Sequence, residues 1–170
     1  EYFMKTRKLK IFYDSRKLKT LKIIALAFSG ILLLWFTFDI TGLKIGDTKI
    51  VTSAFIDEPI DFVFYLILIA SIVCFILKDK IGKYFLSAFL LFWGVFQFTV
   101  YFKTDDNLAA YNKTFADTHH IIAASQNTLI KDTFHIFLDI FILFAFITIL
   151  IFLIAKIASN KKKSQTKESL

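Results

Sequence analysis

Cysteine, proline and glycine are scarce in this chain, whose 170 residues include one cysteine, one proline and five glycines. The single cysteine, Cys74, has no second thiol in the chain with which to pair. An internal disulfide and a thiol redox pair are therefore excluded.

Motifs that usually indicate catalysis or nucleic-acid binding are missing as well. No HExxH zinc motif occurs, and Ser125 lies in "AASQN" rather than in the GxSxG turn of a hydrolase. Internal repeats, which are typical of inverted-repeat transporters, are absent. The basic residues flank apolar segments and belong to no recognition motif, so a nucleic-acid partner is not expected.

Apolar residues, by contrast, are abundant: 56% of the chain is hydrophobic, and 22 residues are Phe. Phe85 to Phe102 is a stretch of 18 residues without charge, and Ile140 to Ala155 is another of 16. A membrane-crossing helix needs about 20 mostly apolar residues, because the hydrocarbon layer is about 30 Å thick. The composition therefore predicts an integral membrane protein that lies in the lipid bilayer.

Four apolar segments predict an all-α bundle of four transmembrane helices. The spans are expected at about 21–40, 60–77, 81–102 and 134–158. Together they form a membrane domain over 21–158, between a basic juxtamembrane segment at 1–20 and a disordered basic tail at 159–170. The short link "KDKIGK" makes the second and third spans antiparallel neighbours. With one cysteine, the bundle is a poor match to four-span families whose outer loops are joined by disulfides.

Lys and Arg are distributed unevenly between the two sides of this bundle. Of the 21, eight lie between residues 5 and 22, three in "KDKIGK" and five from Lys156 onward. The loops 41–59 and 103–133 carry only the remaining five. Because positive charge stays in the cytoplasm, we expect a multi-pass protein of the cell (plasma or inner) membrane with both termini cytoplasmic. The net charge of +7 then follows mainly from topology.

The two outer loops are expected to form a small extracytoplasmic cap. In the first, Gly46 and Asp47 lie between apolar stretches and fit the turn of a β-hairpin. In the second, apolar residues recur at spacings of three, four and seven, at Leu108, Tyr111, Phe115 and Ile122. This spacing predicts an amphipathic helix that lies on the membrane surface or across the mouth of the bundle.

Each span also carries a polar side chain near its expected outer end. These outer-mouth candidates are Asp39, Asp61, Gln97 and Asp139, together with His135, one helical turn before Asp139. Toward the cytoplasm, ionisable groups are absent until Lys22, Lys78 and Lys156, which can reach the inner interface. Ionisable groups within a membrane are costly and usually face the bundle interior.

Three interpretations of His135 and Asp139 stay open. If the fourth span begins at Ile140, Asp139 lies at the headgroups and needs no explanation. If the span begins at Phe134, Asp139 lies roughly 7.5 Å inside it, and a hydrogen-bonded His–Asp pair holds the outer loop onto the bundle. The third interpretation is a divalent metal site whose weak candidate ligands are Asp117, His119, His120, His135 and Asp139.

These observations lead to three hypotheses about function. The leading one is a non-enzymatic accessory, regulatory or immunity-type module, without a cofactor, that binds another membrane protein or itself. The first alternative is an oligomeric channel or small-solute transporter in which Asp39, Asp61 and Asp139 form an acidic outer mouth. The second alternative is a metal-dependent enzyme at the outer membrane interface.

Overall fold

Four helices in the structure, a computed structural model, are long and apolar enough to cross a membrane. They cover Ser15–Thr41, Pro59–Leu77, Asp79–Thr99 and Thr133–Lys161. The structure describes residues 2–57, 59–100, 113, 116–122 and 131–168. The prediction of a mainly helical, multi-pass membrane protein is confirmed.

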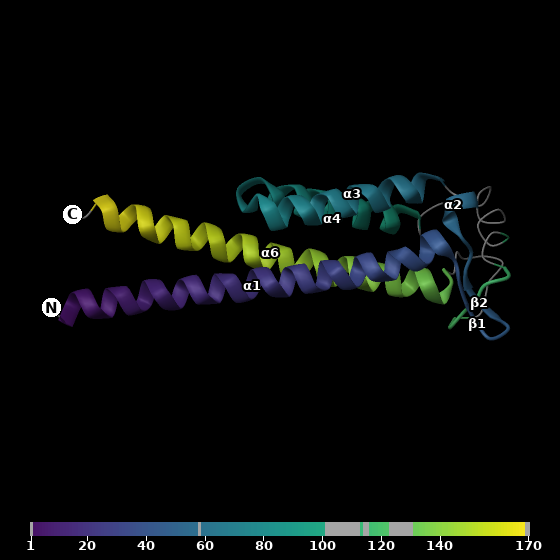
Figure 1. The fold of residues 1–170 in the computed structure, drawn as a ribbon, viewed down its shortest axis with the longest axis horizontal. Helices are drawn as coiled ribbons and strands as arrows, with labels where there is room; N and C mark the ends of the chain where they lie inside the picture. Colours follow the sequence, from purple (N-terminus) through teal and green to yellow (C-terminus); the bar gives the residue numbers. More distant parts are fainter. Residues whose placement is uncertain (1, 58, 101–112, 114–115, 123–130, 169–170) are drawn as a thin grey trace.

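The elements follow one another in a simple order. They are α1 (Tyr2–Thr41), β1 (Leu43–Ile45), β2 (Thr48–Val51), α2 (Ala54–Asp57), α3 (Pro59–Leu77), α4 (Asp79–Val100) and α6 (Thr133–Glu168). The four long helices run up, down, up and down (Figure 1).

The long helices close into a ring of antiparallel neighbours. α1 packs most extensively on α6, and α3 packs most extensively on α4. α4 also contacts α6, and α1 contacts α3. Both termini lie at one end of the bundle, which we call the terminal end, and the β-hairpin lies at the opposite end, which we call the cap end (Figure 1).

Aromatic side chains fill much of the interior between these helices. Phe36 of α1 meets Trp93 of α4 with ring centroids 4.6 Å apart, and Phe75 of α3 meets Phe152 of α6 at 5.4 Å. All four side chains are at most 1% exposed. Large apolar side chains also cover the outward faces of the spans, which is typical of helices that face lipid.

A single residue, Lys78, connects α3 to α4. Its backbone N–H donates to the carbonyl of Cys74 at 2.8 Å, and its own carbonyl accepts the N–H of Gly82 at 2.8 Å. Gly82 permits this close crossing, because a Cβ at that position would overlap the backbone of Phe75. The antiparallel pairing expected from the short link is therefore present.

Three charged side chains meet where the spans stop at the terminal end. The carboxylate of Asp79 lies 3.2 Å from Nζ of Lys22 in α1 and 3.5 Å from Nζ of Lys156 in α6. This cluster, the terminal-end triad, joins α1, α4 and α6. Its side chains are a quarter to a third exposed, so we assign it a role in positioning the helices rather than a large share of stability.

Polar residues mark two levels that are almost equally spaced on every span. The pairs Lys22–Asp39, Asp61–Lys78 and Asp139–Lys156 are each separated by 17 residues, and the pair Asp79–Gln97 by 18. At 1.5 Å per residue these separations are roughly 26 Å. That length is close to the thickness of the hydrocarbon layer, about 30 Å, so both levels lie near its boundaries.

The first and last helices extend well past the spans at the terminal end (Figure 1). The sequence predicts a separate basic segment at 1–20 and a disordered tail at 159–170, whereas α1 starts at Tyr2 and α6 continues through Glu168. Neither extension contains glycine or proline. Lysine, glutamine and glutamate favour helix, which accounts for the continuation.

The cap end begins with a short antiparallel hairpin. Ile45 pairs with Thr48 across a turn in which Gly46 has a φ of 59°, a conformation that glycine adopts most readily. In the second loop, residues 116–122 form turns and bends. The amphipathic helix expected from Leu108, Tyr111 and Phe115 lies mainly outside the described residues.

The α3–α4 crossing gives a first test of the fold. Gly82→Ala should lower the free energy of unfolding by about 1–3 kcal/mol, because the added methyl group forces two backbones apart. Gly30→Ala is the matched control, since Gly30 lies inside α1 with no atom within 4 Å of an added Cβ. The control should be neutral or slightly stabilising. Equal effects of the two substitutions, measured by thermal unfolding in micelles, would contradict this account of the crossing.

Candidate functional site

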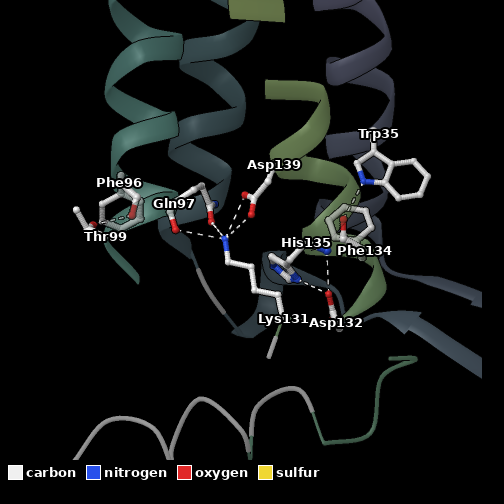
Figure 2. Close-up of polar contacts among 9 residues, drawn as sticks. All are labelled: Trp35, Phe96, Gln97, Thr99, Lys131, Asp132, Phe134, His135 and Asp139. Carbon is white, nitrogen blue, oxygen red and sulfur yellow. Dashed lines mark hydrogen bonds and ion pairs between the residues drawn. The ribbon is translucent and has the colours of Figure 1, made fainter. Parts of the chain in front are cut away.

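Lys131 is at the centre of a polar cluster at the cap end (Figure 2). It lies just before α6, and its Nζ reaches the two carboxylate oxygens of Asp139 at 2.9 and 3.1 Å. The same ammonium donates to the side-chain carbonyl of Gln97 at 2.9 Å and to the backbone carbonyl of Gln97 at 3.3 Å. Lys131, Gln97 and Asp139, the cap-end cluster, thus tie the segment before α6 to both α6 and α4.

The cap-end cluster places charge in a largely apolar setting. The side chain of Lys131 is 4% exposed, while that of Asp139 is 25% exposed. Burial lowers the pKa of Lys131 below its usual value, although the charge and hydrogen bond of Asp139 oppose this shift. If either side chain of such a pair is removed, the other charge stays buried without a partner. That unpaired charge destabilises the fold more than the intact ion pair does.

Asp132, the next residue, caps the first turn of α6. Its Oδ1 accepts the backbone N–H of His135 at 2.9 Å and lies 2.7 Å from Nδ1 of the same residue. This is the geometry of an N-cap, with histidine where a capping box has glutamate. Burial alone would raise the pKa of Asp132, but the hydrogen bonds and charge of His135, together with a bond from Thr118, hold that pKa below its usual value.

The loop before α6 and the helix α1 hold the same turn from two sides. His119 donates its N–H to the carbonyl of Lys49 in β2 at 2.8 Å and accepts the N–H of Thr133 at 2.9 Å. Its Nδ1 also lies 2.8 Å from Oγ1 of Thr133. From α1, Nε1 of Trp35 donates to the carbonyl of Phe134 at 3.2 Å, and the two rings stack at 5.1 Å (Figure 2).

His135 and Asp139 belong to two different ties, although they lie one turn apart on α6. His135 bonds to Asp132 and also interacts electrostatically with Asp39, whose side chain is 3% exposed. Asp139 bonds instead to Lys131. The loop is therefore held onto the bundle at two points rather than by a single His–Asp pair.

The other candidates from the sequence lie in separate places. Gln97, near the end of α4, joins the cap-end cluster through Lys131. Asp61 lies in the first turn of α3, where a carboxylate complements the positive end of the helix dipole. Asp117 is exposed in a turn, and His120 is half-buried. Among the outer-mouth candidates, the contacts described here link Gln97 with Asp139 through Lys131, and His135 with Asp39.

Within the described ranges, no group of three or more His, Cys, Asp or Glu side chains could hold a metal ion. Two of the weak candidate ligands are engaged in other contacts: His119 with Thr133, and His135 with Asp132. Asp139 faces the ammonium of Lys131, which competes with a cation for the same oxygens. The described residues thus form hydrogen-bonded ties rather than a preformed metal site.

Sequence reasoning does not single out Lys131 or Asp132. Lys131 counts there only as a loop charge, because a lysine outside the helix is not recognised as a partner of Asp139 by helical spacing. The string "KDTFH" does contain a signal, since an Asp immediately before an apolar helix is a typical N-cap. A helix that begins at Thr133, as α6 does, has Asp132 at its N-cap position.

Comparison with known proteins assigns no family to this chain. The chain matches no protein-family model, and no curated protein or solved structure is significantly similar to it.

The charge pair in the cap-end cluster predicts a non-additive pair of substitutions. Lys131→Met should lower the free energy of unfolding by about 2–3 kcal/mol, because Asp139 keeps its charge without a partner. The double variant Lys131→Met with Asp139→Leu should recover most of this loss. A double-mutant cycle in micelles measures the coupling, and simple additivity of the two substitutions would show that the pair is not the source of the cost.

The cap on α6 predicts a loss of stability in acid. The folded-state pKa of Asp132 lies below its usual 3.8, so its contribution is fully present above pH 3.8 and is lost as pH falls through the folded pKa. Melting temperatures between pH 6 and pH 3 should therefore drop for the wild type. Asp132→Asn should have a lower melting temperature at pH 6 and a shallower acid drop, whereas parallel curves would refute the assignment.

Proposed function

We propose that this protein is a non-enzymatic accessory, regulatory or immunity-type module that binds another membrane protein, or a second copy of itself, through its cap. The proposal rests on the polar contacts at the cap end. There, Lys131 bonds to Asp139, and His135 bonds to Asp132, all within the chain. These bonds hold the cap rigidly on the bundle. A surface that is fixed before binding loses less conformational entropy when a partner docks.

Exposed apolar side chains on the cap support the same proposal. Ile45 is 64% exposed, Phe55 63%, Ile121 59% and Ile122 57%. These residues lie outside the four spans, so the hydrocarbon layer does not cover them. Because each is already about 40% buried, its full burial against a partner would add roughly 1–2 kcal/mol. Exposed apolar groups of this kind are typical of interaction sites.

The proposed orientation has both termini in the cytoplasm and the cap outside, in the cell membrane. Eight Lys and Arg residues lie between residues 5 and 22, and five lie from Lys156 onward. Both groups belong to the terminal end of the bundle (Figure 1). Because positive charge is retained on the cytoplasmic side, the partner would be met on the opposite, outer side.

The two alternatives receive less support from the same geometry. In an acidic pore mouth, Asp139 would attract cations, but the ammonium of Lys131 lies 2.9 Å from it and cancels most of its field. For a metal-dependent enzyme, ring nitrogens of the histidines would need to bind the metal, but Nδ1 of His119 and Nδ1 of His135 lie within hydrogen-bond distance of Thr133 and Asp132.

The direct test is purification of the tagged protein from its own membrane in mild detergent, with mass spectrometry and native molecular mass. We expect a second membrane protein in a fixed ratio, or a defined oligomer of the chain. A monomer with no co-purifying protein, in detergents that preserve membrane complexes, would contradict the proposal.

Matched isoleucine substitutions locate the binding surface. The triple variant Ile45→Ala, Ile121→Ala and Ile122→Ala should weaken association about tenfold or more, because it removes apolar area from the interface. The control triple replaces three exposed isoleucines of the spans by alanine, at Ile76, Ile151 and Ile154. Equal loss of the partner in both triples would exclude the cap as the binding surface.

A further inference from the structure

Lys83 is a buried lysine without an acidic partner among the described residues. It lies in the second turn of α4 and is only 6% exposed. Within the described ranges it makes no ion pair or hydrogen bond, and its Nζ instead lies 4.9 Å from the centroid of the Tyr84 ring. Lysine is rarely buried unless it is paired. The missing partner of Lys83 therefore points to a ligand.

The position of Lys83 in α4 places its charge at the edge of the hydrocarbon layer. Asp79, in the terminal-end triad, marks that edge, and Lys83 lies four residues farther along the helix, roughly 6 Å deeper. Because α4 begins at the terminal end, its Cα–Cβ bonds tilt back toward that end. The apolar stem of Lys83 then lies in the hydrocarbon, while its ammonium reaches toward the lipid headgroups.

The ammonium of Lys83 is also accessible from outside the bundle. In the part of the chain that the structure describes, the fully enclosed side-chain nitrogen and oxygen atoms without a hydrogen bond do not include its Nζ. Tyr84, whose ring lies beside this nitrogen, is 51% exposed. Tyrosine is typical of the boundary between hydrocarbon and headgroups. A ligand can thus reach the ammonium without a rearrangement of the helices.

The charge balance at the terminal end favours an anion as the ligand. Residues 15–38, 62–96 and 140–167, which include this end of all four spans, contain twelve Lys and Arg residues but a single acidic residue, Asp79. The carboxylate of Asp79 is already shared by the two lysines of the terminal-end triad. The positive charge of Lys83 is therefore not balanced by this carboxylate.

Two neighbouring lysines distinguish an anionic lipid from a zwitterionic one. Lys78 and Lys80 lie at the α3–α4 turn, and both are exposed. A zwitterionic headgroup would bring its own positive charge close to these lysines, whereas an anionic headgroup brings none. Lysine binds phosphate as a point charge, and the cytoplasmic leaflet is the one that is rich in anionic lipids.

We propose that Lys83 binds the phosphate of an anionic membrane lipid at the terminal end, with Lys78 and Lys80 beside the headgroup. The phosphate belongs to a lipid rather than to a soluble compound, because Lys83 lies deeper than the terminal-end triad, where acyl chains surround the helices. Contact with the ring of Tyr84 holds the ammonium in place. The site is separate from the cap and does not require the proposed protein partner.

Native mass spectrometry of the purified, delipidated chain tests the selectivity. The probes are phosphatidylglycerol, phosphatidylethanolamine and phosphatidylcholine with identical acyl chains. Phosphatidylglycerol should bind about tenfold or more tightly than either zwitterionic lipid, because its phosphate makes a charge-assisted contact that no headgroup ammonium opposes. Equal binding of the three lipids would overturn the proposal.

Two lysine substitutions distinguish a site from diffuse attraction to a basic surface. Lys83→Met should remove most of the preference for phosphatidylglycerol. Lys19→Met is the matched control, because it removes the same charge from an exposed position of α1 near the same end, and it should keep the preference. Equal losses in the two variants would show diffuse attraction and would overturn the proposal.

Glycerol phosphate separates a lipid site from a site for soluble phosphates. This compound carries the phosphate group without acyl chains. A large excess should leave phosphatidylglycerol bound to the chain, since the lipid also contacts the apolar surface of the helices. Complete displacement by glycerol phosphate would assign the site to a soluble phosphate and overturn the lipid assignment.

Thermal unfolding in nonionic detergent separates lipid binding from a structural role of Lys83. Added phosphatidylglycerol should raise the melting temperature of the wild type and of Lys19→Met, because a ligand that binds only the folded state stabilises it. The melting temperature of Lys83→Met should not respond. Without lipid, Lys83→Met should melt at the wild-type temperature or above, since methionine keeps an apolar stem and removes an unpaired charge. A large loss of stability in lipid-free Lys83→Met would assign the lysine to the fold and overturn the proposal.

Discussion

Four helices that are apolar on nearly every side need charged groups to fix their depth in a bilayer and their alignment with one another. The terminal-end triad and the cap-end cluster supply these groups at two levels, separated by roughly one thickness of hydrocarbon. Each cluster joins helices that are distant in the sequence. Between the two levels, association of the helices depends on close packing rather than on a hydrophobic driving force, so the charged ends determine which residues face each other.

At the start of α6, two adjacent residues of opposite charge make different contacts. Lys131 turns toward α4 and the body of α6, while Asp132 turns back to cap the helix and bind His135. Trp35 and His119 hold the same turn from α1 and from the loop. Because so many contacts meet there, this turn connects the cap to the bundle.

Much of the architecture can be predicted from patterns in the sequence. The features that cannot be predicted in this way have physical reasons. The spans follow from uncharged windows such as Ile140 to Ala155, and the antiparallel α3–α4 pair follows from its short link. Lys131 and Asp139 are harder to pair, because one lies before the helix and the other two turns inside it. The ends of α1 and α6 are polar, which indicates segments outside the bundle, but they contain good helix formers and neither glycine nor proline, so the helices continue through them.

The single-residue link at Lys78 and the packing of α1 on α6 place opposite demands on chain assembly. α3 and α4 are already side by side once both are made, because one residue joins them. α1, in contrast, is synthesised first, and its most extensive contact is with the last helix. At ribosomal speed it stays in the membrane without that contact for on the order of ten seconds.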